Sequence, residues 1–313
     1  MNPSALSRRQ MCRLLAAGPA AFALGAGRFA AADPKPLVLR YVLASSMYGT
    51  LKLEDIVPGV RKAGADSIDL WPCRHADQRE QMDAMGHEKF AELLKANDVK
   101  LGMTTRYDLG PFGLQDEMRV LKKFGGSLVI AGSHGPRDVE GEEAKRAVKQ
   151  FIDQMKPHVA VAEELGITIG IENHAHALLS TPDSLRYFAE FATSPNLGVA
   201  LAPYHLPQDV GVLAGLIEDM GPSLVHFYAW QHGQGCMEKL PKAQELEQMP
   251  GRGVLDFKPL LAALEKIGYQ GWTEIFMHPV PRGIPILDTL EQVTAEINLA
   301  RRYLAGCLRE MGG

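Results

Sequence analysis

Residues 166–174 read Gly-Ile-Thr-Ile-Gly-Ile-Glu-Asn-His, and this short stretch decides the fold. Gly166 ends a helical pattern over Glu140–Leu165, and the run that follows is apolar at nearly every position. A strand that is buried on both faces has this pattern, whereas a strand with one face in water alternates apolar and polar residues. The stretch therefore predicts a strand over Thr168–Glu172 in a parallel sheet that is covered by helices.

The same alternation of short apolar runs and longer helical patterns continues on both sides of this stretch. Thr181 and Pro182 mark the start of a helix that includes Leu185–Phe191, and another helix over Asp256–Ile267 ends at Gly268. Strand–helix units of about 35 residues favour a closed barrel over an open sheet, and no Gly-x-Gly-x-x-Gly turn follows the first strand. We therefore predict a single (β/α)8 TIM barrel, with strands at Leu37–Val42, Ser67–Leu70, Lys100–Thr104, Leu128–Ala131, Thr168–Glu172, Gly198–Ala202, Leu224–Tyr228 and Thr273–Met277.

The first 32 residues differ from the rest of the chain. They contain four arginines, no acidic residue and an Ala/Gly/Leu-rich run, and they end in Ala30-Ala31-Ala32. This pattern is typical of a signal peptide, and Ser7-Arg8-Arg9-Gln10-Met11 resembles the twin-arginine type. We expect residues 1–32 to be a signal peptide, residues 33–313 to form the barrel, and the barrel to be periplasmic.

Charge and hydropathy exclude two classes of partner. Removing the first 32 residues takes the formal net charge from −4 to −8, which leaves no basic footprint for a nucleic-acid backbone. No apolar run is long enough to span a bilayer. One stretch, Gln231–Arg252, has no clear period, and a long loop at this face of a barrel is more often a lid or a binding loop than slack.

Polar residues gather at the predicted carboxyl ends of the strands, where barrel enzymes have their active sites. Glu172 and Glu274 each end or interrupt an apolar strand, where an unpaired carboxylate is unfavourable without a function. With His226 and His205 they form a donor set that suits a divalent metal such as Mn, Co, Zn or Mg. We predict Glu172, Glu274 and His205 as catalytic residues. The predicted substrate contacts are Arg106, His134, His174, Tyr204, Trp230 and His278.

Four motifs resemble the xylose-isomerase-like barrel superfamily, which includes ketose 3-epimerases, inosose dehydratases, hydroxypyruvate isomerases and apurinic endonucleases. The resemblance covers most of Pro36–Leu308. It rests on the His226 strand and on Gly-Ile-Glu-Asn-His, Gly-Arg-Gly-Val-Leu-Asp at Gly251–Asp256 and Gly-Tyr-Gln-Gly-Trp-Thr-Glu at Gly268–Glu274. It implies a barrel that acts on a small carbohydrate, and dimers are common in the family.

The resemblance also implies a four-residue metal site in the epimerase branch, with Glu, Asp, His and Glu on strands five to eight. Glu172, His226 and Glu274 match three of these ligands, but the Asp of the strand-six motif Asp-x-x-His is replaced by Ala202, and only His205 remains. Three outcomes are open. His205 enters the coordination sphere, water fills the gap, or the metal is absent.

Three functions are open. The first is metal-assisted proton abstraction next to a carbonyl of a sugar, by an isomerase or epimerase with Glu172 or Glu274 as the base. The second is a 3-keto-glycoside lyase that acts by β-elimination, which begins with the same step. The third is a sugar-binding barrel without chemistry. An apurinic endonuclease is disfavoured because no Asp-x-His pair follows His226.

Overall fold

The computed structural model describes residues 36–233 and 238–312. The predicted signal peptide, residues 1–32, lies outside this range and stays a prediction. In the described part of the chain, no helix is both long enough and apolar enough to cross a membrane.

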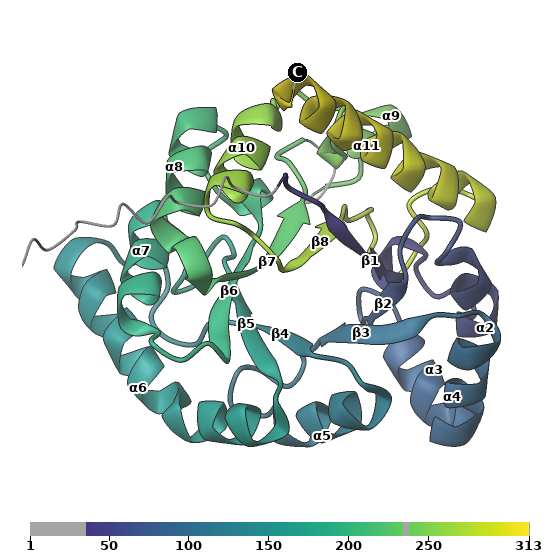
Figure 1. The fold of residues 1–313 in the computed structure, drawn as a ribbon, viewed down its shortest axis with the longest axis horizontal. Helices are drawn as coiled ribbons and strands as arrows, with labels where there is room; N and C mark the ends of the chain where they lie inside the picture. The colour runs from purple at the N-terminus through teal and green to yellow at the C-terminus, as the bar shows by residue number, and fades with distance from the viewer. Residues whose placement is uncertain (1–35, 234–237, 313) are drawn as a thin grey trace, which may run out of the picture. The chain divides into compact units, whose positions relative to one another are not determined.

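Eight parallel strands close into one barrel, in which each strand pairs with its neighbours in sequence and β1 pairs with β8 (Figure 1). This topology confirms the predicted (β/α)8 fold. The closure leaves no sheet edge, and the helices that connect the strands form the outer layer of the barrel. The strands are β1 Arg40–Ala44, β2 Ser67–Leu70, β3 Lys100–Thr105, β4 Leu128–Gly132, β5 Thr168–Glu172, β6 Leu197–Leu201, β7 Leu224–Ala229 and β8 Trp272–Ile275.

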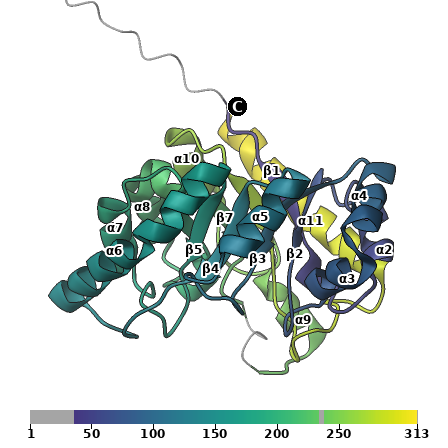
Figure 2. The same ribbon diagram turned by 90° about the horizontal axis from the view of Figure 1, so that it is seen from below.

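The helices surround the strands, with α2, α3 and α4 beside one another on one side of the ring (Figure 1). Figure 2 shows the start of β1 at one end of the barrel and α9, which follows β7, at the other end. That second end holds the carboxyl ends of the strands. The helices are α2 Leu53–Ile56, α3 Gln78–Met85, α4 His87–Ala96, α5 Gln115–Phe124, α6 Gly141–Leu165, α7 Pro182–Phe191, α8 Val210–Met220, α9 Lys242–Glu245, α10 Lys258–Lys266 and α11 Leu290–Met311.

The predicted strand bounds agree with the structure at β2 and β5 and shift most at the two strands that close the barrel. β1 begins at Arg40 rather than Leu37, because the Leu37 amide donates to Glu265 Oε1 instead of joining the sheet. β8 ends at Ile275, two residues before the predicted end. Both shifts arise where the first and last strands meet, a pairing between distant segments that local patterns do not reveal.

Helix α7 begins as its sequence predicts. Thr181 Oγ1 accepts a hydrogen bond from the Ser184 amide, and the Ser184 hydroxyl pairs with the amide of Thr181 in return. Pro182 occupies the first helical turn, where its missing N–H is not needed. The same reciprocal cap joins Thr289 and Gln292 at the start of α11, which closes the ring of helices.

The long loop after β7 is held to the barrel by hydrogen bonds. It contains α9 and a short 3-10 turn at Leu246–Gln248. The buried Gln248 side chain accepts a hydrogen bond from Trp230 Nε1 at 3.0 Å and donates one to the His278 carbonyl at 2.8 Å. The loop therefore holds together the segments that follow β7 and β8.

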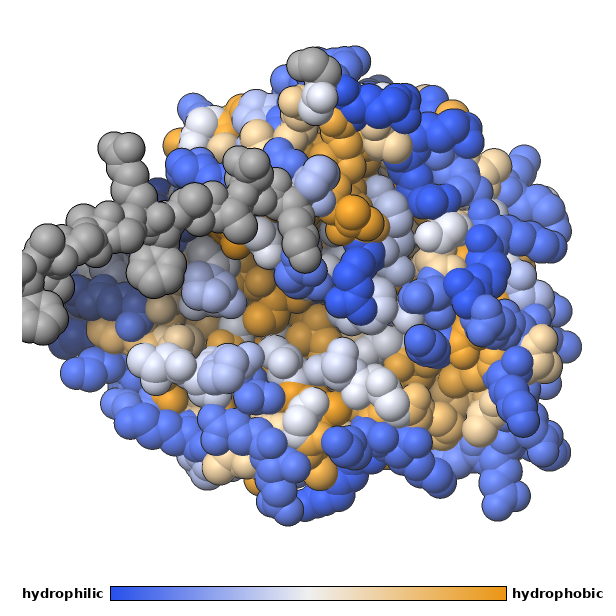
Figure 3. Space-filling model, viewed as in Figure 1, coloured by the Kyte–Doolittle hydropathy of each residue, from blue (hydrophilic) through white to orange (hydrophobic). Residues whose placement is uncertain are grey.

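Apolar residues of the described chain form one continuous core, and hydrophilic side chains cover much of the rim of the face shown in Figure 3, with apolar ones nearer its middle. Two glycines differ in the space around them, so alanine substitutions at both test how closely the core is packed. A Cβ at Gly198 in β6 would lie 2.6 Å from the Ser223 carbonyl oxygen and 2.3 Å from Val225 Cγ1, whereas a Cβ at Gly215 in α8 meets nothing within 4 Å.

Gly198→Ala is expected to lower the free energy of unfolding by about 1–3 kcal/mol, because backbone must move to admit the methyl group. Gly215→Ala is expected to raise it by about 0.5–1 kcal/mol, because alanine restricts the unfolded chain in a helix that already has room. Urea unfolding of both variants measures the difference. Equal effects would contradict the packing seen at Gly198.

Candidate active site

The carboxyl end of β5 places Glu172 inside the barrel mouth. Glu172 is the last residue of the strand and is 3% exposed, and its Oε2 has no hydrogen-bond partner. Its Oε1 lies 3.9 Å from Nε2 of His205, which ends the short 3-10 turn after β6. Burial, with the charge of Glu274 as a second cause, raises the pKa of the Glu172 carboxyl well above its ordinary value.

A second carboxylate, Glu274 in β8, pairs with the imidazole of His226 in β7. Glu274 Oε2 lies 3.0 Å from His226 Nε2, and both side chains are fully buried. Burial lowers the pKa of His226 to about 3, so its ring is neutral at physiological pH. Burial also raises the pKa of the Glu274 carboxyl well above its ordinary value.

A third buried carboxylate, Asp69 in β2, was not predicted from the sequence. Asp69 Oδ2 accepts a 2.7 Å hydrogen bond from the Thr105 hydroxyl at the end of β3, and its Oδ1 has no partner. Burial, and then the charge of Glu274, raise the pKa of Asp69 well above its ordinary value. The signal was present in Ser-Ile-Asp-Leu-Trp, where an acid interrupts an apolar strand as Glu274 does.

A cavity of about 350 Å³ opens beside this acidic centre. His205 connects the two, because it lines the cavity and contacts Glu172. Burial, and then the neighbouring His174 and Arg282, lower the pKa of His205 to about 2, so it too is neutral. The lining residues are His174, Ala175, His176, Tyr204, His205, Leu206, His232 and Arg282.

Two stacked pairs of rings lie near this cavity. Tyr204 stacks on Trp230 with ring centroids 4.1 Å apart and planes 9° apart. His278 stacks on His75 at 4.6 Å and meets the edge of Trp230. Burial and the nearby Arg282 charge hold the pKa of His278 well below its ordinary value. The predicted contacts His174, Tyr204, Trp230 and His278 therefore belong to one neighbourhood, linked through His205.

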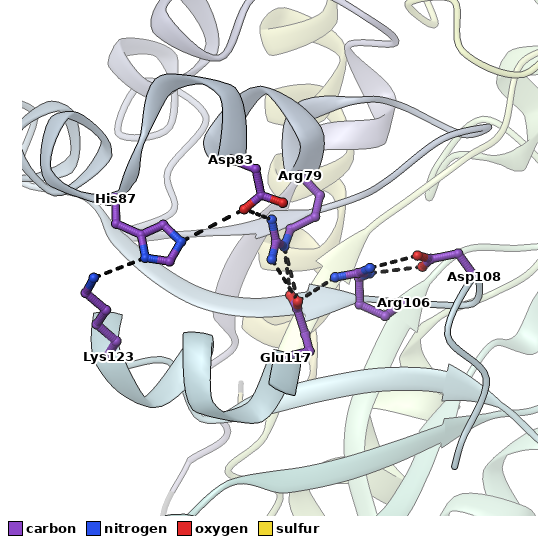
Figure 4. Close-up of polar contacts among 7 residues, drawn as sticks. All are labelled: Arg79, Asp83, His87, Arg106, Asp108, Glu117 and Lys123. Carbon is purple, nitrogen blue, oxygen red and sulfur yellow. Dashed lines mark hydrogen bonds and ion pairs between the residues drawn. The ribbon is translucent and has the colours of Figure 1, made fainter. Parts of the chain in front are cut away.

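Two predicted substrate contacts lie apart from the cavity. Arg106 pairs with Glu117 and makes two hydrogen bonds to Asp108, at 2.9 and 2.7 Å (Figure 4). His134 is exposed, and its ring packs against Phe112. Neither residue lines the cavity, because the segments that follow β3 and β4 turn them toward α5 and toward solvent.

The sequence over residues 59–291 matches the family model described as xylose isomerase-like TIM barrel. The chain belongs to this family. A search among curated proteins finds no match.

Solved structures with this fold include proteins that carry sugar-epimerase names. A crystal structure of the IolI protein with zinc has a TM-score of 0.66 at 16% identity, and the likeness covers 87% of this chain and 99% of that chain. D-psicose 3-epimerase with D-tagatose, from Clostridium cellulolyticum H10, has a TM-score of 0.64 at 17% identity over 86% and 99% of the two chains. A D-tagatose 3-epimerase-like protein has 0.62 at 16% over 87% and 100%. At these identities the likeness shows the fold.

The metal site that the family resemblance implies does not fit the residues present in this xylose isomerase-like barrel. Ala202 is fully buried at the strand-six position and offers no ligand atom. Within residues 36–233 and 238–312, no three His, Cys, Asp or Glu side chains are grouped so as to hold an ion. The arrangement gathers imidazole–carboxylate pairs, whereas catalytic zinc sites use three protein ligands.

Proposed function

We propose that this barrel is an enzyme that moves a proton at the carbon next to a carbonyl of a sugar, as an isomerase or epimerase. One observation carries the proposal: Glu172 and Glu274 are both buried in the barrel mouth beside a cavity that His205 lines, and Glu172 Oε2 has no hydrogen-bond partner. A buried carboxylate oxygen without a partner is costly, so a structural role does not explain Glu172.

The position of each residue assigns its role in the proposed proton transfer. Glu172 lies nearest the cavity through His205 and acts as the base, and its raised pKa makes its carboxylate a stronger acceptor for a carbon-bound proton. The neutral His205 imidazole donates a hydrogen bond to the substrate carbonyl oxygen, which stabilises the developing enediolate. Glu274 in β8, whose pKa is raised by burial, begins in its protonated form and donates its own proton to the carbon, while the abstracted proton stays on Glu172. The Tyr204–Trp230 stack offers a flat surface for a sugar ring.

β-Elimination from a 3-keto-glycoside is the second candidate, because it begins with the same proton abstraction. The predicted export of residues 33–313 to the periplasm favours it, since glycosides reach that compartment while sugar phosphates are mostly cytoplasmic. Export, a homodimer and the absence of nucleic-acid partners remain part of the proposal. The version of the reaction that uses a divalent metal requires ligands that the described residues do not gather.

The test follows the proton and the product together. Ketoses and 3-keto-glycosides are incubated with the full chain in D₂O, and each substrate is followed by proton NMR. Deuterium at the carbon next to the carbonyl, with an epimer or isomer formed, supports the proposed reaction. Release of the aglycone assigns the protein to elimination. Binding of these sugars with neither exchange nor release would overturn the enzyme proposal and leave a sugar-binding barrel.

A further inference from the structure

We propose that Asp69 and His226 hold Glu274 in this barrel in place of a divalent ion, so that the chain binds no such ion tightly at Glu172, His226 and Glu274. Asp69 is then a positioning residue. The positioning part rests on the proposed function, whereas the part about the ion stands on the donor set alone.

The end of β6 offers no side-chain ligand. Ala202 occupies the place of the expected carboxylate, and its backbone is fastened on both sides by one buried amide. Asn173 Oδ1 accepts from the Ala202 amide at 2.7 Å, and Asn173 Nδ2 donates to the Ala202 carbonyl at 3.0 Å. This clamp uses the backbone groups of Ala202 that face Asn173 and fixes the segment. The His205 side chain, three residues further along, lies near Glu172, with its Nε2 3.9 Å from Glu172 Oε1.

The remaining donors are arranged as separate pairs. His226 is committed to Glu274 at 3.0 Å, and Glu172 is near His205 at 3.9 Å, so the donors form two pairs rather than one shell. A pair leaves most of the coordination sphere of an ion to water. Of the ligands that the resemblance implies, each pair therefore supplies two, which is fewer than the three of catalytic zinc sites and the four of structural ones.

Asp69 in β2 adds a further carboxylate near Glu274, and in the strand order of the barrel β2 and β7 lie on opposite sides of β8. The Thr105 hydroxyl donates to Asp69 Oδ2 at 2.7 Å, and Asp69 lies close enough to Glu274 that the charge of Glu274, after burial, raises the pKa of Asp69. Glu274 is therefore held between an imidazole from β7 and a carboxyl group from β2. Strands from three parts of the barrel fix one acid without any ion.

Metal content and thermal stability test the part about the ion. The full chain, purified without chelator, is expected to carry well under one divalent ion per chain. Its melting temperature should not rise with Mn²⁺, Co²⁺ or Zn²⁺, because an ion that binds the folded state would stabilise it by mass action. Ala202→Asp, which restores the missing carboxylate, is expected to gain such a rise. About one ion per chain in the unmodified protein, lost in Glu172→Gln, would overturn the inference.

Substitutions at Asp69 test its positioning role. Asp69→Ala should lower kcat by about 10²-fold with little change in KM, because a misplaced catalytic acid costs about that much. Asp69→Asn, which keeps an oxygen for the Thr105 hydroxyl and an amide for Glu274, should recover much of the loss. Asp66→Asn, just before β2, is the matched control and should keep full activity. A folded Asp69→Ala protein with normal kcat would overturn this role.

The two failures are distinguishable. If no sugar is turned over, the proposed function fails, but metal content and melting temperature still decide the claim about the ion. If turnover is found and depends on a bound ion, the proposed function stands and this inference falls.

Discussion

Glu172→Gln is expected to leave the barrel folded and to lower turnover by a factor of about 10²–10⁴, the usual contribution of a general base. The amide has the same shape as the carboxylate and removes a buried ionisable group whose Oε2 has no partner, so folding has little to lose. It cannot accept the proton from the substrate carbon. Steady-state kinetics on the substrate found by deuterium exchange measure the loss, and circular dichroism checks the fold.

Two further variants test whether the loss is specific to the proposed acids. Glu274→Gln should produce a comparable loss, because the amide cannot donate the proton that the carbon receives from Glu274. Glu164→Gln, on the exposed face of α6, serves as the control and should keep normal turnover. Near-normal activity in either Glu172→Gln or Glu274→Gln would contradict the assignment of two acids to the proton transfer.

Glu117→Gln is expected to lower the free energy of unfolding by about 3–5 kcal/mol, the cost of removing one partner of a buried ion pair. Glu117 in α5 is 3% exposed and accepts hydrogen bonds from Arg79 Nε at 3.0 Å and Nη2 at 2.9 Å (Figure 4). It also pairs with Arg106. Without this carboxylate, two guanidinium groups with little access to water lose their shared counter-charge.

Urea unfolding followed by tryptophan fluorescence measures this loss. Asp116→Asn, one residue earlier on the exposed side of α5, is the matched control and should change stability by less than about 0.5 kcal/mol, because its pair with Arg119 lies in water. A loss at Glu117 no larger than that of the control would mean that Asp83, which pairs with Arg79, and Asp108, which pairs with Arg106, supply enough counter-charge by themselves. Turnover of the folded Glu117→Gln protein should be near normal, since Arg106 does not line the cavity.

The site was predictable where each residue could be judged by its own strand. Glu172 and Glu274 are acids in apolar strands, and His205 follows a strand end, so the rule that barrel chemistry lies at the carboxyl ends of strands placed them in the mouth. Asp69 satisfied the same criterion and was overlooked. Arg106 also satisfied the positional rule, yet Glu117 draws it away from the cavity. A partner on a distant helix is not visible in the residues next to Arg106.

By itself, the sequence determined that this protein is a closed parallel barrel, because strands buried on both faces and capped helices are local patterns. It also determined that Ala202 cannot be a ligand, since a methyl group has no donor atom. Only the tertiary structure decided that Asp69 lies near Glu274 and that His226 pairs with Glu274. It also placed Glu172 near His205, so that the predicted ligands do not surround one ion site. These contacts cross the barrel, and they depend on the register and stagger of eight strands, which no single segment encodes.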